Sequence, residues 1–186
     1  MEELKIAQLF DLTETIAAPL FMRHTYPWEV LPEIGEYILE LGGTLSFDEY
    51  ELVNDNIWIA KSAKVALTAS ITGPCIIGKN AEIRHCAFIR GNAIVGEGAV
   101  VGNSTELKNV VLFNKVQVPH YNYVGDSILG YRLTDTSRHT FYDTFYNSSK
   151  RIKILNGFFC LILYGNRSFL IRNRKRISVP FFNIKS

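Results

Sequence analysis

The sequence predicts a mainly β protein whose central part, residues 57–131, winds into a parallel β-helix. Three observations predict this fold: a large apolar residue returns every six residues, the fifth residue of most hexads is small or β-branched, and the pattern runs through consecutive hexads. A helical leader (residues 1–56) is expected before the β-helix, and an irregular tail (residues 132–186) after it.

Apolar residues at roughly helical spacing predict a first amphipathic helix within residues 3–22 of the leader. The segment from Pro27 to Pro32 is expected to turn the chain, and residues 33–41 to form a second amphipathic helix that Gly42 and Gly43 terminate. We expect the apolar side of the leader to pack on the repeat or on another subunit.

The repeat is counted from Ile59. The first positions of its ten hexads are Ile59, Val65, Ile71, Ile77, Ile83, Ile89, Val95, Val101, Leu107 and Phe113. An α-helix cannot keep a period of six on one face, whereas short strands joined by corners can, with three hexads forming one triangular coil. Residues 59–130 then supply about four coils. A β-sandwich with coincidental spacing is the alternative.

Two details of the coils are also predicted. Gly78, Gly96 and Gly102 stand at second positions, where a corner is expected to need permissive backbone. The pattern is expected to break at Pro119 and to resume one residue early, at Val124.

Composition limits the function. No apolar run reaches the 18 residues of a membrane span, and the acidic N-terminus lacks the apolar region of a signal peptide. A cytoplasmic protein without a membrane partner is therefore expected. Cys75, Cys86 and Cys160 lack CxxC spacing and are expected to be reduced, with Cys75 filling the core.

Charge divides the chain: residues 1–134 carry a net −6 and residues 135–186 a net +8. The basic, aromatic tail could contact nucleic acid or a membrane surface. The alternative is an adventitious tail. It is preferred because the tail lacks a regular amphipathic period, so no nucleic-acid partner is expected.

Cations at second positions are exceptional, and Arg90 and Lys108 lie 18 residues apart, so they should stack on one corner. Such a pair would suit an anionic ligand, unless both side chains are simply solvated. His120 also falls at a second position, one corner further round, and could act as a general base or be an ordinary surface residue. Groups on different corners can meet only between chains. The remaining histidines are too scattered for a metal site, so no metal is expected.

Two segments resemble a known family. Glu106-Leu107-Lys108-Asn109 and the segment from Pro119 to Asp126 look like the E-x-K-N and G-H-x-x-Y-x-G-D signatures of the acetyltransferase domain of bacterial N-acetylglucosamine-1-phosphate uridyltransferases. The spacings between Arg90, Lys108 and His120 agree as well. The resemblance covers roughly residues 57–131.

The resemblance implies a left-handed β-helix, a homotrimer with sites between subunits, acetyl-CoA as co-substrate and a sugar phosphate as acceptor. It implies that Arg90 and Lys108 hold the phosphate, that Tyr123 contacts the substrate, and that His120 is the catalytic base. Residues for binding acetyl-CoA are not identified.

The chain also departs from the family. The nucleotidyltransferase domain and its Gly-rich loop are missing, so uridylyl transfer is not expected. The family's coils that bind acetyl-CoA are not matched after Leu133, which favours a truncated, stand-alone relative related to nucleotide-sugar pyrophosphorylases. Two functions therefore remain open: an N-acetyltransferase, or a non-catalytic trimeric scaffold or sugar-phosphate-binding module.

Overall fold

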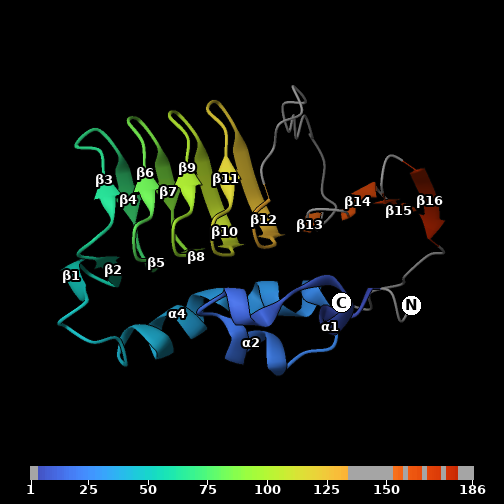
Figure 1. Ribbon diagram of the computed structural model, residues 1–186, viewed down its shortest axis with the longest axis horizontal. Helices are drawn as coiled ribbons and strands as arrows, with labels where there is room; N and C mark the ends of the chain where they lie inside the picture. Colours follow the sequence, from blue (N-terminus) through green and yellow to red (C-terminus); the bar gives the residue numbers. More distant parts are fainter. Residues whose placement is uncertain (1–3, 134–152, 157–158, 165–166, 173–174, 180–186) are drawn as a thin grey trace.

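The computed structural model describes residues 4–133 with their side chains, and the backbone of four further strands at residues 153–156, 159–164, 167–172 and 175–179 (Figure 1). Short helices precede a stack of short strands. The helices are α1 (Ile6–Leu9), η2 (Leu12–Glu14), α2 (Ala18–Met22), α3 (Pro27–Val30), η3 (Leu31–Glu33) and α4 (Ile34–Gly42).

The strands follow in chain order. They are β1 (Tyr50–Asn54), β2 (Ile57–Ala60), β3 (Lys64–Val65), β4 (Ser70–Thr72), β5 (Cys75–Ile77), β6 (Glu82–Ile83), β7 (Phe88–Arg90), β8 (Ala93–Val95), β9 (Val100–Val101), β10 (Glu106–Leu112), β11 (Gln117–Val118), β12 (Tyr123–Leu129), β13 (Lys153–Asn156), β14 (Phe159–Tyr164), β15 (Arg167–Arg172) and β16 (Lys175–Val179).

From β2 to β12 the strands form a left-handed parallel β-helix of about four coils, as expected. Each coil has three sides, which gives the stack three faces. The leader face holds β2, β5, β8 and the second halves of β10 and β12. The β3 face holds β3, β6, β9 and β11, and the β7 face holds β4, β7 and the first halves of β10 and β12.

The register of the coils changes earlier than the sequence predicts. Ile77 pairs with Val95, 18 residues on, but Val95 pairs with Leu112, only 17 residues on. The coil is therefore one residue shorter at the corner after Lys108, whereas the sequence predicted this break at Pro119. Phe113 is therefore not the interior residue of a tenth hexad. Its apolar character concealed the shift, because Leu112 beside it fills the interior instead.

Left-handed backbone at the corners occurs at the fourth position of a side, and not at the second position as predicted. Positive φ recurs at the fourth residue of the sides, at Asn80, Cys86, Asn92, Gly98 and Ser104, and again after the register change. The second-position glycines have ordinary φ. A Cβ on Gly96 would lie 2.5 Å from the carbonyl carbon of Phe113 in the next coil, so these glycines are small because two backbones approach closely.

The leader is more broken than predicted. Instead of one helix within residues 3–22 there are α1, η2 and α2, because Asp11 caps a new turn by accepting a hydrogen bond from the Thr13 N–H, and Pro19 lies at the start of α2. The segment expected to be a turn forms α3 and η3, each with a proline in its first turn, where the missing N–H costs nothing. The helix expected at residues 33–41 is α4.

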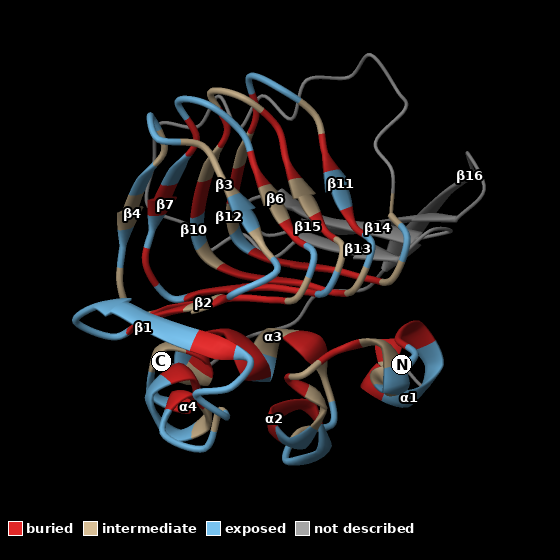
Figure 2. Ribbon diagram, turned by 60° about the vertical axis from the view of Figure 1, so that its left-hand side comes forward, coloured by how far each residue is buried: buried red, intermediate tan, exposed pale blue. Residues whose placement is uncertain are grey.

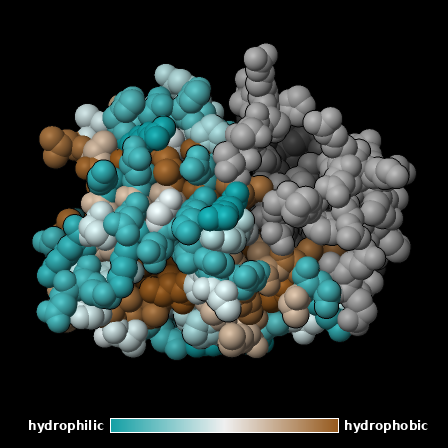
Figure 3. All heavy atoms as spheres, in the orientation of Figure 1, coloured by the Kyte–Doolittle hydropathy of each residue, from teal (hydrophilic) through white to brown (hydrophobic). Residues whose placement is uncertain are grey.

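The leader packs on the repeat domain. Its helices form a layer beneath the leader face (Figure 1), and the strands of that face are buried along their length (Figure 2). The outward side chains of this face are Trp58, Ile76, Ile94, Val111 and Ile128, all buried. In Figure 3 hydrophobic atoms gather along the seam between coils and helices. Each such side chain contributes about 1.5–3 kcal/mol when fully buried, so the seam is a second core.

Phe113 joins the leader to the coils. Its ring lies 5.3 Å from the rings of both Phe10 and Phe21, and its side chain is fully buried. Close approach also requires Gly42 of α4, because a Cβ there would collide with the Trp58 ring.

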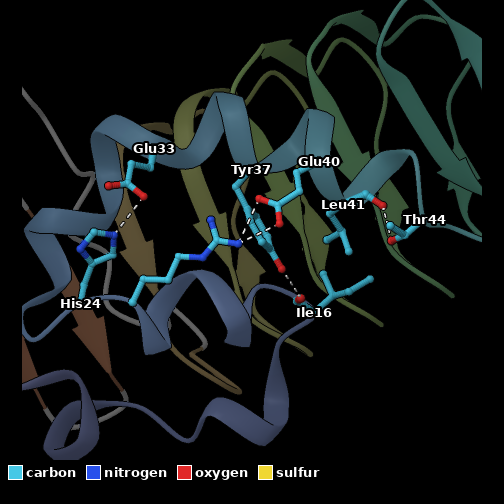
Figure 4. Close-up of polar contacts among 8 residues, drawn as sticks. Ile16, His24, Glu33, Tyr37, Glu40, Leu41 and Thr44 are labelled. Carbon is cyan, nitrogen blue, oxygen red and sulfur yellow. Dashed lines mark hydrogen bonds and ion pairs between the residues drawn. The ribbon is translucent and has the colours of Figure 1, made fainter.

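Hydrogen bonds and ion pairs connect the helices of the leader to one another (Figure 4). The Arg23 guanidinium donates to both carboxylate oxygens of Glu40, at 2.8 and 3.0 Å, and the Tyr37 hydroxyl donates to the Ile16 carbonyl. His24 Nε2 lies 3.2 Å from a carboxylate oxygen of Glu33. These contacts link the chain around α2 to η3 and α4.

Four strands lie where an irregular tail was expected. β13 pairs in parallel with β12, and β14, β15 and β16 follow as antiparallel neighbours. The expectation of irregular structure is therefore corrected for these strands, whose β-branched and aromatic residues favour extended backbone. Within the described part of the chain, no helix is long and apolar enough to cross a membrane.

Candidate functional site

The predicted substrate residues lie together on the β7 face. Along one row of this face Ser70 pairs with Phe88, Phe88 with Glu106, and Glu106 with Tyr123. Two residues further along each strand stand Thr72, Arg90, Lys108 and Gly125. All of these side chains point outward, because the residues between them, such as Ile89 and Leu107, are interior and fully buried.

Arg90 ends β7 and is held in place. Its Nη1 donates to Glu106 Oε1 at 2.7 Å, and its guanidinium carbon lies 6.0 Å from the centre of the Phe88 ring. The hydrogen bond from Arg90 and the negative charge of Glu106 raise the pKa of the guanidinium above its ordinary value. Arg90 is therefore an oriented, permanently charged donor rather than a splayed side chain.

Lys108 lies in β10 beside Arg90, as the 18-residue spacing predicted. The pairing of Leu107 with Ile89 sets the two cations on neighbouring strands, whose backbones lie about 4.8 Å apart. Lys108 is exposed, and within the described part of the chain its ammonium group makes no hydrogen bond or ion pair. An anion on this corner could reach both cations.

Tyr123 begins β12 and is half-buried. Its ring and hydroxyl lie over Gly125, where any side chain would collide with them. Gly125 thus lets the tyrosine extend along the strand toward the corner with Lys108.

Two other residues of the motifs build the corner. Asn109 and Asp126 both have positive φ, 50° and 45°, and Asn109 Nδ2 donates to Asp126 Oδ1 at 2.8 Å. Asn and Asp tolerate left-handed backbone better than most residues. No role was predicted for Asn109 and Asp126 from the sequence, although their residue types are typical of a corner with left-handed backbone.

His120 is separated from this cluster, as predicted, but not at the predicted position. Val118 pairs with Val101, which sets His120 opposite Asn103, one place beyond the second position. It is exposed in the corner between the β3 and β7 faces, with its ring edge-on to Tyr121. Arg90 and Lys108 lie at the opposite edge of the β7 face, so one chain does not bring the three together.

Glu106 is the residue of this face that the sequence analysis did not select. Its signal was available, because it stands at the start of the first motif, 16 residues from Arg90 and one strand away. Among the described residues, no group of three or more histidine, cysteine or acidic side chains could hold a metal ion.

The coils define a class of protein domain, the hexapeptide-repeat left-handed β-helix. The family model described as the GMPPB C-terminal domain matches residues 71–134. A bifunctional protein GlmU of Methanococcus maripaludis strain S2 is 34% identical over 87 residues, covering 37% of this chain and 21% of that protein. A GlmU of strain C5 is 53% identical over 30 residues, covering 16% and 7%.

The repeat is therefore similar in sequence to the GMPPB C-terminal domain and to part of these GlmU proteins. The chain spans about a fifth of the length of the first of these curated relatives.

Proposed function

We propose that the β-helix is an acyl-CoA-dependent N-acetyltransferase that acts on an amino sugar phosphate or a nucleotide sugar. The observation that carries this proposal is the adjacency of Arg90 and Lys108 on one corner, with Tyr123 beside them. Paired cations with convergent donors suit a phosphate group, and guanidinium–phosphate hydrogen bonds are charge-assisted and short. The resemblance of the two motifs to acetyltransferase signatures supports an acetyl group as the transferred unit.

His120 acts as the general base in this proposal. It takes a proton from the sugar amine while the amine nitrogen attacks the thioester carbonyl of acetyl-CoA, and the C–S bond breaks to release the thiol. Histidine is a common general base, and the imidazole of His120 is exposed, so a substrate amine can approach it. Because His120 lies across the β7 face from Arg90, the base is supplied by a neighbouring copy in a homotrimer.

The test is a thiol-release assay with glucosamine-1-phosphate and acetyl-CoA. We expect His120→Ala to lower turnover by about 10²–10⁴-fold, the usual contribution of a general base. His85→Ala is the matched control: His85 is also exposed, and its carbonyl accepts a hydrogen bond from Ser104 in the coil between it and His120.

Equal loss in both histidine variants would contradict a specific role of His120. Phosphate binding without any turnover in the wild-type protein would instead support the second function, a sugar-phosphate-binding module, which needs only the residues of one β7 face.

A further inference from the structure

We infer that Glu106 competes with the phosphate ligand for Arg90 and thereby sets the affinity of the site. This inference rests on the proposed phosphate-binding role of Arg90 and Lys108. It is carried by the contact between Glu106 and Arg90 and by the place of Glu106 on the β7 face.

Glu106 lies within the site rather than at its margin. It pairs with Phe88 on one side and Tyr123 on the other, and its carboxylate reaches along the face to Arg90 Nη1 at 2.7 Å. The Phe88 ring restrains the same guanidinium. The donors of Arg90 are therefore already oriented, and one of them is occupied by an anion that belongs to the chain.

A carboxylate and a phosphate oxygen are interchangeable acceptors for a guanidinium. A phosphate bound between Arg90 and Lys108 must take the N–H that Glu106 now accepts, or lie beside its negative charge. Both outcomes weaken phosphate binding. The ion pair is about half exposed on the arginine side, at 46% for Arg90 and 32% for Glu106, so a ligand can displace it at modest cost.

Lys108 provides a second cation beside Arg90, which helps a phosphate to displace Glu106 from the guanidinium. Within the described residues it has no acidic partner, so an incoming phosphate first meets an unpaired cation next to a paired one. The arrangement favours dianionic phosphate, which gains from both cations, over a singly charged carboxylate, which would only replace Glu106.

The chain contains a matched control pair. Arg84 Nε donates to Glu82 Oε1 at 2.9 Å, and the side-chain exposures, 49% and 42%, are similar. Glu82 lies in β6 on the β3 face, away from Lys108 and Tyr123. Glu82→Gln therefore removes an ion pair of the same kind outside the site.

The experiment titrates inorganic phosphate into the full-length protein by isothermal calorimetry at constant ionic strength. We expect Glu106→Gln to bind phosphate about 3–10-fold more tightly, since an exposed ion pair is worth up to roughly fivefold and the lost repulsion adds to it. Glu106→Asp should lie between wild type and Glu106→Gln, Glu82→Gln should match wild type, and Arg90→Met should bind more weakly.

Unchanged or weaker phosphate binding by Glu106→Gln, with Arg90→Met still impaired, would overturn the inference and leave the proposed function standing. Absence of phosphate binding in both wild type and Glu106→Gln would overturn the phosphate site itself, and the inference with it. Thermal unfolding of the Glu106 and Glu82 variants separates a folding defect from a change of affinity, and Glu106→Asp provides a second measurement if Glu106→Gln unfolds.

Discussion

Residues inside the coils are constrained by the small volume of the interior and by the short distance to the backbone of the next coil. Cys75, Ala93 and Val110 stack at the same interior position of successive coils, and all three are fully buried. The prediction that Cys75 fills the core is confirmed, because its residue type and hexad position together specify a small apolar group. The exposure of Cys86 could not be predicted in the same way, since it depends on the left-handed corner.

Burial should make Cys75 unreactive. Loss of hydration raises the pKa of its thiol to about 12, so at pH 8 the native protein holds it protonated and inaccessible. We expect iodoacetamide to label Cys86 and to spare Cys75 until denaturant is added, as peptide mapping by mass spectrometry would show. Labelling of both at equal rates in the native protein would contradict the packing.

The same shift predicts a pH dependence of stability. The folded state keeps a proton that the unfolded thiol, with its ordinary pKa near 9, releases. The contribution of Cys75 is therefore fully present below about pH 9 and declines as pH rises toward 12. Urea unfolding at pH 8 and pH 10 should show a larger fall for wild type than for Cys75→Ala.

Gly96 should not tolerate a side chain. The added Cβ would approach the Phe113 backbone at 2.5 Å, and we expect Gly96→Ala to destabilise the protein by about 1–3 kcal/mol in urea unfolding. Gly43→Ala is the control, because its φ is −65° and the nearest atoms to its Cβ lie 3.7 Å away. Similar stability of both variants would refute close backbone contact at the corner.

At the scale of elements, the repeat could be predicted from the sequence, but its register change and the breaks between the helices of the leader could not. A period of six specifies which residues share a face, and the strands from β2 to β12 form the expected coils. The shortened side after Lys108 was missed because Phe113 is as apolar as Leu112, and only contact with the leader distinguishes them. The breaks in the leader depend on Asp11 and on prolines, which are local signals that spacing of apolar residues does not detect.

In the candidate site, too, some features could be predicted from the sequence and others could not. Arg90 and Lys108 could be predicted as neighbours because they lie 18 residues apart, one full coil, and Tyr123 was predicted from its motif. The ion pair between Arg90 and Glu106 depends on side-chain rotamers, which no spacing determines. His120 was misplaced by one position for the same reason as Phe113.

Phe113 should be the principal contact between leader and coils. Truncation to alanine removes a ring that touches Phe10 and Phe21, and large-to-small changes of buried aromatic residues cost about 3–5 kcal/mol. Chemical denaturation should therefore show a large loss for Phe113→Ala and little for Phe47→Ala, whose side chain is 74% exposed. Comparable effects would mean that the leader does not depend on this cluster.

At the scale of the whole molecule, the leader covers one face of the β-helix, so we expect the contacts of the proposed homotrimer on the other two faces. A site shared between copies makes a specific prediction. Coexpressed His120→Ala and Arg90→Met chains, each inactive alone, should recover about a third of wild-type activity in mixed trimers, because one of the three interfaces of each mixed trimer joins two intact halves. Purification through two different tags isolates the mixed assemblies, and no recovery would place the whole site within one chain.

The leader also changes how the stack can come apart. A β-helix whose coils touch only their neighbours unfolds in steps from either end. Here α4 contacts β5, β8 and β10, so one rigid element bridges successive coils. Loss of a single coil then requires loss of the helix that spans its neighbours. The amide protons of the leader face should consequently exchange with solvent as one cooperative group, whereas those of the β3 face are free to exchange coil by coil.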